Sequence, residues 1–241
     1  MRYALRDLIE ISLAQGRYDQ AREEVAAIQM TARWPREPAS DQMRLGQVDY
    51  WQGRLAEARA HFEAALEGFQ ALSDSNGISW APAWLGCVAY RAGDLQQAQA
   101  LMEAGLANFV GAPSELIFAL FSRADVARAQ GDWAYAAEVY ARGLKLALDQ
   151  GGQPDLPPFL EALAKLALAT TLPNRAARLL GAADALRRRI GMPIPPVEQA
   201  DYDQALAQAR DQLGPAAFAA AWDDGRALGW EQAVDLAQTG K

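Results

Sequence analysis

One histidine and one cysteine, His61 and Cys87, are the residues of this sequence best suited to nucleophilic chemistry. A thiol beside an imidazole can act as a nucleophile, because the imidazole accepts the thiol proton. The helical pattern described below places His61 on the second helix of one hairpin and Cys87 on the first helix of the next, in register with groove-facing positions. We interpret them as a surface imidazole and a buried or groove-lining thiol, so the sequence predicts a protein that is not an enzyme.

Metal and phosphate sites have equally little support in the sequence. One histidine and one cysteine cannot form a four-ligand zinc site without two carboxylates. The sequence has no G-x-x-x-x-G-K-[ST] phosphate loop, and Gly151-Gly152 lies in a Gly/Pro-rich loop between repeats. The acidic pairs Glu23-Glu24 and Asp223-Asp224 are typical of solvated helix faces. We therefore expect no catalytic residue, no metal and no cofactor.

The main basic cluster is Arg187–Arg189 together with Arg175 and Arg178. These arginines could contact phosphate, but they also lie near a helix C-terminus, where the helix dipole favours cations. The whole chain carries a net charge of −7 and has a pI of about 4.8. This acidic balance disfavours a nucleic-acid binder and gives no polybasic attraction to anionic membranes.

The chain has no pattern that predicts export or membrane insertion. Arg2, Arg6, Asp7 and Glu10 interrupt the apolar residues of the N-terminus, which therefore lacks the apolar core of a signal peptide. No apolar run approaches the roughly 18 residues of a membrane-spanning helix. A single cysteine cannot form an intrachain disulfide and suits a reducing compartment. We expect a soluble, cytoplasmic protein.

A repeat organises most of the sequence. Turn residues recur at intervals of 37, 40, 38 and 40 residues, at Gly16, Gly53, Gly93, Gly131 and Thr171. Each hairpin after the first has one small residue on its first helix and two on its second, which lets the two helices approach closely. These positions are Gly46, Ala58 and Ala65; Gly86, Ala98 and Gly105; Ala124, Ala136 and Gly143; and Ala164, Ala176 and Ala183.

This pattern resembles the tetratricopeptide repeat, a helix-turn-helix unit of about 34 residues. The resemblance implies an all-α fold, a right-handed solenoid of five TPR-like helical hairpins over residues 1–190. A generic bundle of alanine-rich helices is the alternative. Five units in one register favour the repeat.

The segment after the repeats has a different composition. Residues 191–196, Gly-Met-Pro-Ile-Pro-Pro, predict an extended connector, because proline fixes φ and removes a backbone donor. Residues 197–241 should then form three short helices, at about 198–212, 215–227 and 230–238. A solenoid end exposes an apolar face, so we interpret these helices as a cap. A docking or dimerisation element is the alternative.

A second resemblance is carried by the run Ala176 to Arg187 and by Phe218, Ala221-Trp222 and Gly225-Arg226-Ala227-Leu228. These residues resemble the C-terminal helical-repeat sensor region of STAND-type bacterial signalling ATPases, which include LuxR-type transcription regulators. In that family a nucleotide-binding switch domain precedes the sensor region. The phosphate loop and a DNA-reading helix-turn-helix are missing here, so the resemblance implies only the sensor or interaction part of a larger regulator.

The resemblance also implies where a partner binds. In the tetratricopeptide family the first helix of each hairpin lines a concave groove that binds extended peptides or partner helices. Aromatic residues and arginines dominate binding hot spots. Carrying the groove positions over to this sequence predicts a partner-binding groove formed by Tyr50, Trp51, Trp80, Tyr90, Arg91, Phe121, Asp125 and Arg128.

The sequence thus predicts a non-enzymatic interaction or effector-sensing module of a bacterial regulatory protein. Its partner would be a protein or peptide, and a small-molecule effector is an open alternative. We expect no direct contact with nucleic acid. The competing hypothesis is an independent scaffold or adaptor that is not attached to a switch ATPase.

Overall fold

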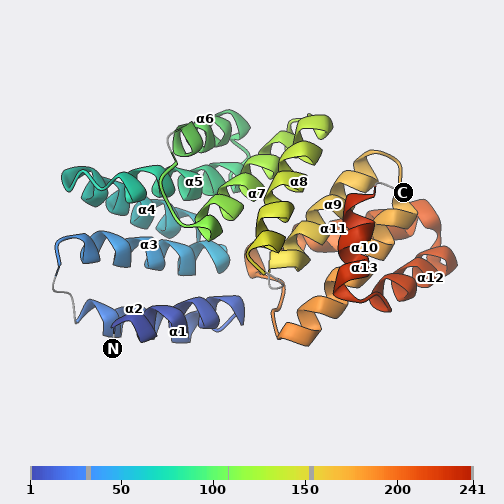
Figure 1. Cartoon of the computed structure of the whole chain (residues 1–241), viewed down its shortest axis with the longest axis horizontal. Coiled ribbons are helices and arrows are strands. Elements are labelled where there is room, and N and C mark those ends of the chain that lie inside the picture. Colours follow the sequence, from blue (N-terminus) through green and yellow to red (C-terminus); the bar gives the residue numbers. More distant parts are fainter. Residues whose placement is uncertain (1, 31–33, 108, 152–154, 240–241) are drawn as a thin grey trace. The chain divides into compact units, whose positions relative to one another are not determined.

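The computed structural model describes residues 2–30, 34–107, 109–151 and 155–239 (Figure 1). The described residues form thirteen helices and no strand, which confirms the predicted all-α fold. The helices are α1 (Arg2–Ala14), α2 (Tyr18–Gln29), α3 (Arg36–Trp51), α4 (Leu55–Ala71), α5 (Ser75–Arg91), α6 (Leu95–Ala107), α7 (Pro113–Ala129), α8 (Trp133–Asp149), α9 (Leu156–Ala169), α10 (Pro173–Ile190), α11 (Pro196–Leu213), α12 (Pro215–Arg226) and α13 (Trp230–Gln238).

The chain forms two compact units. The first comprises residues 1–126 and 195–197, and the second comprises residues 127–194 and 198–241. In the first unit α1 packs against α2, α3 against α4 and α5 against α6, while α2–α3 and α4–α5 contacts join successive hairpins. Figure 1 shows α3, α4 and α5 side by side. Hairpins that each contact the next are the arrangement of a helical solenoid.

In the second unit α10 is the central helix. It packs against its hairpin partner α9 and also against α12 and α13. The last three helices begin and end within two residues of the predicted ranges. The division into repeats over 1–190, a connector over 191–196 and a cap over 197–241 stays a prediction, since the two compact units cross these boundaries.

The turn inside each hairpin is closed by a residue with left-handed backbone. Gly53 has a φ of +80° and Gly93 a φ of +84°, values that an L-residue rarely adopts. The residue after the glycine then donates its amide to the preceding helix, as from Asp94 N to Ala89 O over 3.0 Å. Thr171 occupies the same position in the last hairpin with a φ of +59°, so the turn forms even without glycine.

Small residues permit the closest helix contacts. A Cβ atom on Gly86 of α5 would lie 2.8 Å from Met102 Cγ and 3.2 Å from the backbone oxygen of Ala98, both on α6. In the second unit, a Cβ on Gly181 of α10 would collide with the backbone of Trp222 on α12. A Cβ on Gly225 of α12 would collide in turn with the backbone of Arg178. The α10 and α12 backbones therefore touch, which accounts for glycine at two positions of the second resemblance.

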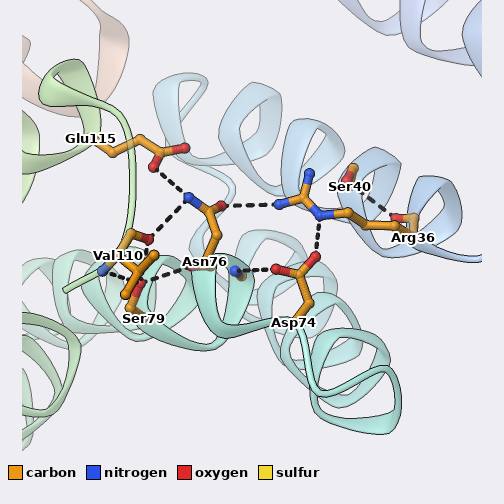
Figure 2. A network of polar contacts seen from close by, with 8 residues as sticks. Arg36, Ser40, Asp74, Asn76, Ser79, Val110 and Glu115 are labelled. Atoms are coloured by element: carbon orange, nitrogen blue, oxygen red, sulfur yellow. Dashed lines mark hydrogen bonds and ion pairs between the residues drawn. The ribbon is translucent and has the colours of Figure 1, made fainter. Parts of the chain in front are cut away.

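A polar network joins the N-terminal ends of two helices to the loop before a third (Figure 2). Arg36 of α3 forms an ion pair with Asp74, the residue that precedes α5. Arg36 also donates from Nη2 to Asn76 Oδ1 over 3.0 Å. The amide nitrogen of Asn76 donates to Val110 O at 3.0 Å and to Glu115 Oε2 at 3.1 Å. This network fixes the relative positions of α3, α5 and the start of α7 in the first unit.

The tight α5–α6 crossing predicts the effect of a larger side chain. Gly86→Leu should lower the free energy of unfolding by about 1–3 kcal/mol, because the neighbouring Ala98 oxygen belongs to the backbone and cannot move aside cheaply. The measurement is urea unfolding followed by circular dichroism. Ala64→Leu, at an exposed position of α4, is the control and should leave stability nearly unchanged. Equal stability of wild type and Gly86→Leu would contradict this packing.

The Asp74 carboxylate predicts a pH-dependent contribution to stability. Partial burial acts to raise the pKa of Asp74, but the hydrogen bonds from Arg36 and the Gly77 amide outweigh burial and lower it. A carboxyl with a lowered folded-state pKa stabilises the fold above its unfolded pKa of about 4, and this stabilisation is lost as the pH falls through the folded-state pKa. Asp74→Ala should therefore cost about 1–2 kcal/mol at pH 7 and much less near pH 2.

This prediction is checked by thermal unfolding of both proteins at pH 7 and at acidic pH. Ser75→Ala, at the exposed neighbouring position, serves as the control with no expected pH-dependent loss. An Asp74→Ala deficit that is equally large at both pH values would show that the charge of Asp74 is not involved.

Candidate partner-binding face

The first helices of successive hairpins contact one another in the first unit. α3 packs against α5, and aromatic rings extend this seam to α7. The Trp84 ring of α5 lies edge-on to Tyr50 of α3 at 5.4 Å and stacks on Phe118 of α7 at 4.1 Å. Cys87 of α5 donates to the hydroxyl of Ser122 on α7 over 3.3 Å. Side chains of α5 therefore connect α3 with α7.

Trp84 is the centre of this aromatic cluster, which sequence analysis missed. Besides Tyr50 and Phe118, its ring contacts Trp51 at 5.8 Å, Phe62 at 5.4 Å and Trp80 at 5.8 Å. Trp84 is only 3% exposed. The available signal was the spacing of Trp80 and Trp84, one turn apart in the largely apolar segment that became α5.

The predicted groove residues of α3 and α5 surround this cluster. Trp51, Trp80 and Tyr90 are half-buried and pack against it. Tyr50 is 4% exposed, so its ring belongs to the core. Its hydroxyl accepts a hydrogen bond from Arg91 Nε over 3.3 Å, and the Arg91 guanidinium lies 5.3 Å from the Tyr90 ring centroid. Tyr50 thus positions Arg91, and Tyr90 provides a cation–π contact.

The other predicted residues lie on α7. Phe121, Asp125 and Arg128 are spaced so that they share one face of this helix. Phe121 is half-buried and Asp125 is buried, both within the first unit. Arg128 is half-buried and belongs to the second unit. We define the first-helix face by the members within the first unit: Tyr50, Trp51, Trp80, Tyr90, Arg91, Phe121 and Asp125. Its role in binding stays a prediction.

His61 and Cys87 have different partners. The Nδ1 atom of His61 lies 2.6 Å from Gln42 Oε1, and its Nε2 atom lies 3.4 Å from a carboxylate oxygen of the buried Asp49. Arg54 donates to the other Asp49 oxygen over 2.8 Å. The half-exposed His61 thus belongs to a polar contact between α3 and α4, while the thiol of Cys87 lies in the α5–α7 seam described above.

The described residues lack two further features. Among the residues with determined positions, no group of three or more His, Cys, Asp and Glu side chains could hold a metal ion. None of the described helices combines the length and the apolar character needed to cross a membrane.

Two arginines of the predicted basic cluster, Arg187 and Arg175, form contacts within the second unit. Arg187 is buried and forms a two-point ion pair with Glu161 of α9, with N–O distances of 2.5 and 2.9 Å. Burial acts to lower the pKa of Arg187, but the bond to Glu161 outweighs it and raises the pKa. Arg175 donates to the carbonyl of Ala237 at the end of α13 over 2.8 Å. Arg175 therefore caps a helix C-terminus, where the dipole favours a cation.

Known proteins share this architecture and part of the sequence. Residues 42–109, which span most of α3 through α6, match the tetratricopeptide repeat family. The fold resembles the crystal structure of PilW, a widely conserved type IV pilus biogenesis factor. That likeness has a TM-score of 0.55 and 16% sequence identity and covers 97% of each chain. The chain is thus an all-α, TPR-like helical solenoid, of which residues 42–109 match the tetratricopeptide repeat family.

A second solved structure with this fold is that of Bacillus thuringiensis PlcR in complex with the peptide PapR7 and DNA. Its TM-score is 0.53 at 10% identity, and the likeness covers 94% of this chain and 74% of PlcR. Sequence relatives include proteins of Mycobacterium bovis and of two Mycobacterium tuberculosis strains whose names describe them as HTH-type transcriptional regulators. They are 36% identical over 129 residues, a segment that is 51% of this chain and 14% of each relative.

The aromatic cluster predicts a large stability difference between two tryptophans. Trp84→Ala should lower the free energy of unfolding by about 3–5 kcal/mol, because it removes the ring that contacts five others. Trp133→Ala, on α8, removes a side chain that is 45% exposed and should change stability by less than about 0.5 kcal/mol. Urea unfolding curves of the two variants check this. Similar losses at both positions would contradict the central place of Trp84.

Proposed function

We propose that the chain is a non-enzymatic interaction module that binds an extended protein or peptide segment on the first-helix face. The observation that carries this proposal is the aromatic cluster around Trp84, which presents Trp51, Trp80 and Tyr90 half-buried beside a positioned arginine. Helical-repeat folds of this kind typically serve as binding scaffolds rather than as catalysts.

The physical argument concerns the cost of ordering side chains. A partner loses affinity when flexible side chains must be immobilised on binding. Trp51 and Trp80 are already held by edge-on contacts with Trp84, at 5.8 Å in each case. Arg91 is likewise held by Tyr50 over 3.3 Å. Rigid aromatic and arginine side chains of this type are the usual anchors of binding energy.

The comparisons support a regulatory setting for this module. The named relatives are called transcriptional regulators, and PlcR, which shares the fold, was solved with a peptide and DNA. We propose that the chain is the effector-sensing or interaction part of such a regulator, of the STAND type, that responds to a protein, a peptide or a small effector. An independent scaffold or adaptor without a switch ATPase remains the competing hypothesis.

A peptide array tests the proposed function. The full chain is incubated with immobilised 12-residue peptides of random sequence, and bound protein is detected through an affinity tag. Wild type should bind a defined subset of the peptides. Trp51→Ala and Arg91→Ala should lose most of that binding, since each removes an anchor of the first-helix face.

Trp133→Ala is the matched control, because it removes an exposed tryptophan in the second unit. It should keep the wild-type binding pattern. Circular dichroism melting of each variant shows whether the fold is retained. If folded Trp51→Ala and Arg91→Ala bind the same peptides as wild type, the first-helix face is not the binding site.

A further inference from the structure

The side chain of Asn76, in the first turn of α5, joins three segments of the first unit. Figure 2 shows it between Arg36 of α3 and Glu115 of α7. Its Oδ1 atom accepts from Arg36 Nη2 over 3.0 Å, and its Nδ2 atom donates to Glu115 Oε2 at 3.1 Å and to Val110 O at 3.0 Å. An asparagine side chain has one acceptor oxygen and two N–H donors, so both its oxygen and its nitrogen are engaged here.

The bond from Asn76 to Glu115 lies next to an aromatic contact between the same two helices. Trp80 follows Asn76 by one turn on α5, and Phe118 follows Glu115 by three residues on α7. The Trp80 and Phe118 rings meet edge-on with their centroids 5.3 Å apart. The thiol–hydroxyl contact described above lies further along the same seam. The polar bond is therefore one helical turn from the rings, and it limits how far the start of α7 can move from α5.

Trp80 is the member of the first-helix face that this spacing affects. Its ring is half-buried and contacts Trp84 at 5.8 Å in addition to Phe118. Phe118 also stacks on Trp84 at 4.1 Å, so one ring of α7 supports both tryptophans of α5. Attraction between rings falls off steeply with distance. A shift of α7 away from α5 would therefore loosen Trp80, the proposed anchor.

We infer that Asn76 is a positioning residue that controls the peptide affinity of the first-helix face, although it is not a member of that face. This inference rests on the proposed function and concerns the regulation of the same site. The bond to Glu115 holds Phe118 where it supports Trp80, so a peptide binds a ring that is already ordered. Loss of the bond should weaken binding by about threefold to thirtyfold, the usual range for substitutions that act on a site through a contact network.

The test exchanges donor and acceptor in the Asn76–Glu115 bond. Asn76→Asp keeps an oxygen for Arg36, but it removes both donors and places a second carboxylate against Glu115. In the double variant Asn76→Asp/Glu115→Gln, the glutamine amide donates to the new carboxylate, and the bond re-forms in the opposite direction. The double variant also has the same net charge as wild type. Val110 O keeps a donor in both variants, because Ser79 Oγ donates to it over 3.0 Å.

The probe is a fluorescein-labelled 12-residue peptide selected on the array, and fluorescence anisotropy gives its dissociation constant for the full chain. Asn76→Asp should bind it about threefold to thirtyfold more weakly than wild type. Glu115→Gln alone should bind as wild type does, since the glutamine oxygen still accepts from Asn76. The double variant should also recover wild-type affinity. Near-ultraviolet circular dichroism, which reports the packing of aromatic rings, should change in Asn76→Asp and recover in the double variant.

Asp94→Ala is the matched control for a general loss of stability. It removes the side chain that caps α6, where Asp94 Oδ1 accepts from the Gln97 amide over 2.9 Å. Asp94 follows the C-terminal end of α5, whereas Asn76 lies in its first turn. Asp94→Ala should lower the melting temperature and leave the peptide affinity unchanged. A matching loss of affinity in Asp94→Ala would attribute the effect to stability and overturn the inference.

The remaining outcomes separate this inference from the proposed function. Equal affinity of wild type and folded Asn76→Asp overturns the positioning role. Failure of the double variant to recover affinity overturns it as well, since a direct contact of Asn76 with the peptide would not be restored by a change at Glu115. In both cases the proposed function stands as long as the peptide binds wild type through Trp51 and Arg91. If no array peptide binds wild type, both are overturned.

Discussion

Close approach of helix backbones is the constraint on which the structure depends. Two helices can pack at the shortest distance only where neither carries a bulky side chain at the crossing point. At the α5–α6 crossing, Gly86 faces Met102 and the Ala98 backbone. At the α10–α12 crossing, Gly181 and Gly225 each face backbone atoms of the other helix. Where helices pack this closely, their larger side chains fill the spaces between the first helices of neighbouring hairpins.

The aromatic cluster follows from that arrangement. With small residues at the α5–α6 crossing, large rings of α5 point toward α3 and α7 and meet there around Trp84. The polar network of Arg36, Asp74 and Asn76 holds the N-terminal ends of the same helices in place. Rigid anchors and a fixed spacing between first helices are both properties that a binding surface for an extended segment needs. The second unit contributes a separate packing centre around α10, with the Arg187–Glu161 pair buried between α9 and α10.

The sequence predicted the features that repeat. Turn residues and small residues recur at fixed positions, so the helices, the left-handed turns at Gly53 and Gly93, and the close crossing at Gly86 were all accessible from spacing alone. The central place of Trp84 was not predicted, because Trp84 occurs in one hairpin and the repeat does not mark it; its one-turn spacing from Trp80 was the available signal. The ion pair between Arg187 and Glu161 was not predicted either. Glu161 belongs to another helix, and a basic cluster in a sequence does not reveal which acidic side chains it contacts.

The contact of Val197 with the core cluster of the first unit was the least predictable feature. Proline content predicted an extended connector but not the contact of Val197, because the cluster that Val197 packs against lies far away in the sequence and is assembled from helices α3 to α7. The candidate site was predicted in part. Trp51, Trp80, Tyr90 and Arg91 surround one cluster, whereas Tyr50 is a buried support and Arg128 belongs to the second unit.

Hydrogen exchange of the full chain, measured by mass spectrometry with and without a peptide selected on the array, tests the central claim most directly. Amides that a bound ligand shields or stabilises exchange more slowly. The account predicts slower exchange in α3, α5 and α7 when the peptide is bound. Slower exchange confined to the second helices α4 and α6, or to α12 and α13, would place the partner elsewhere and contradict the account.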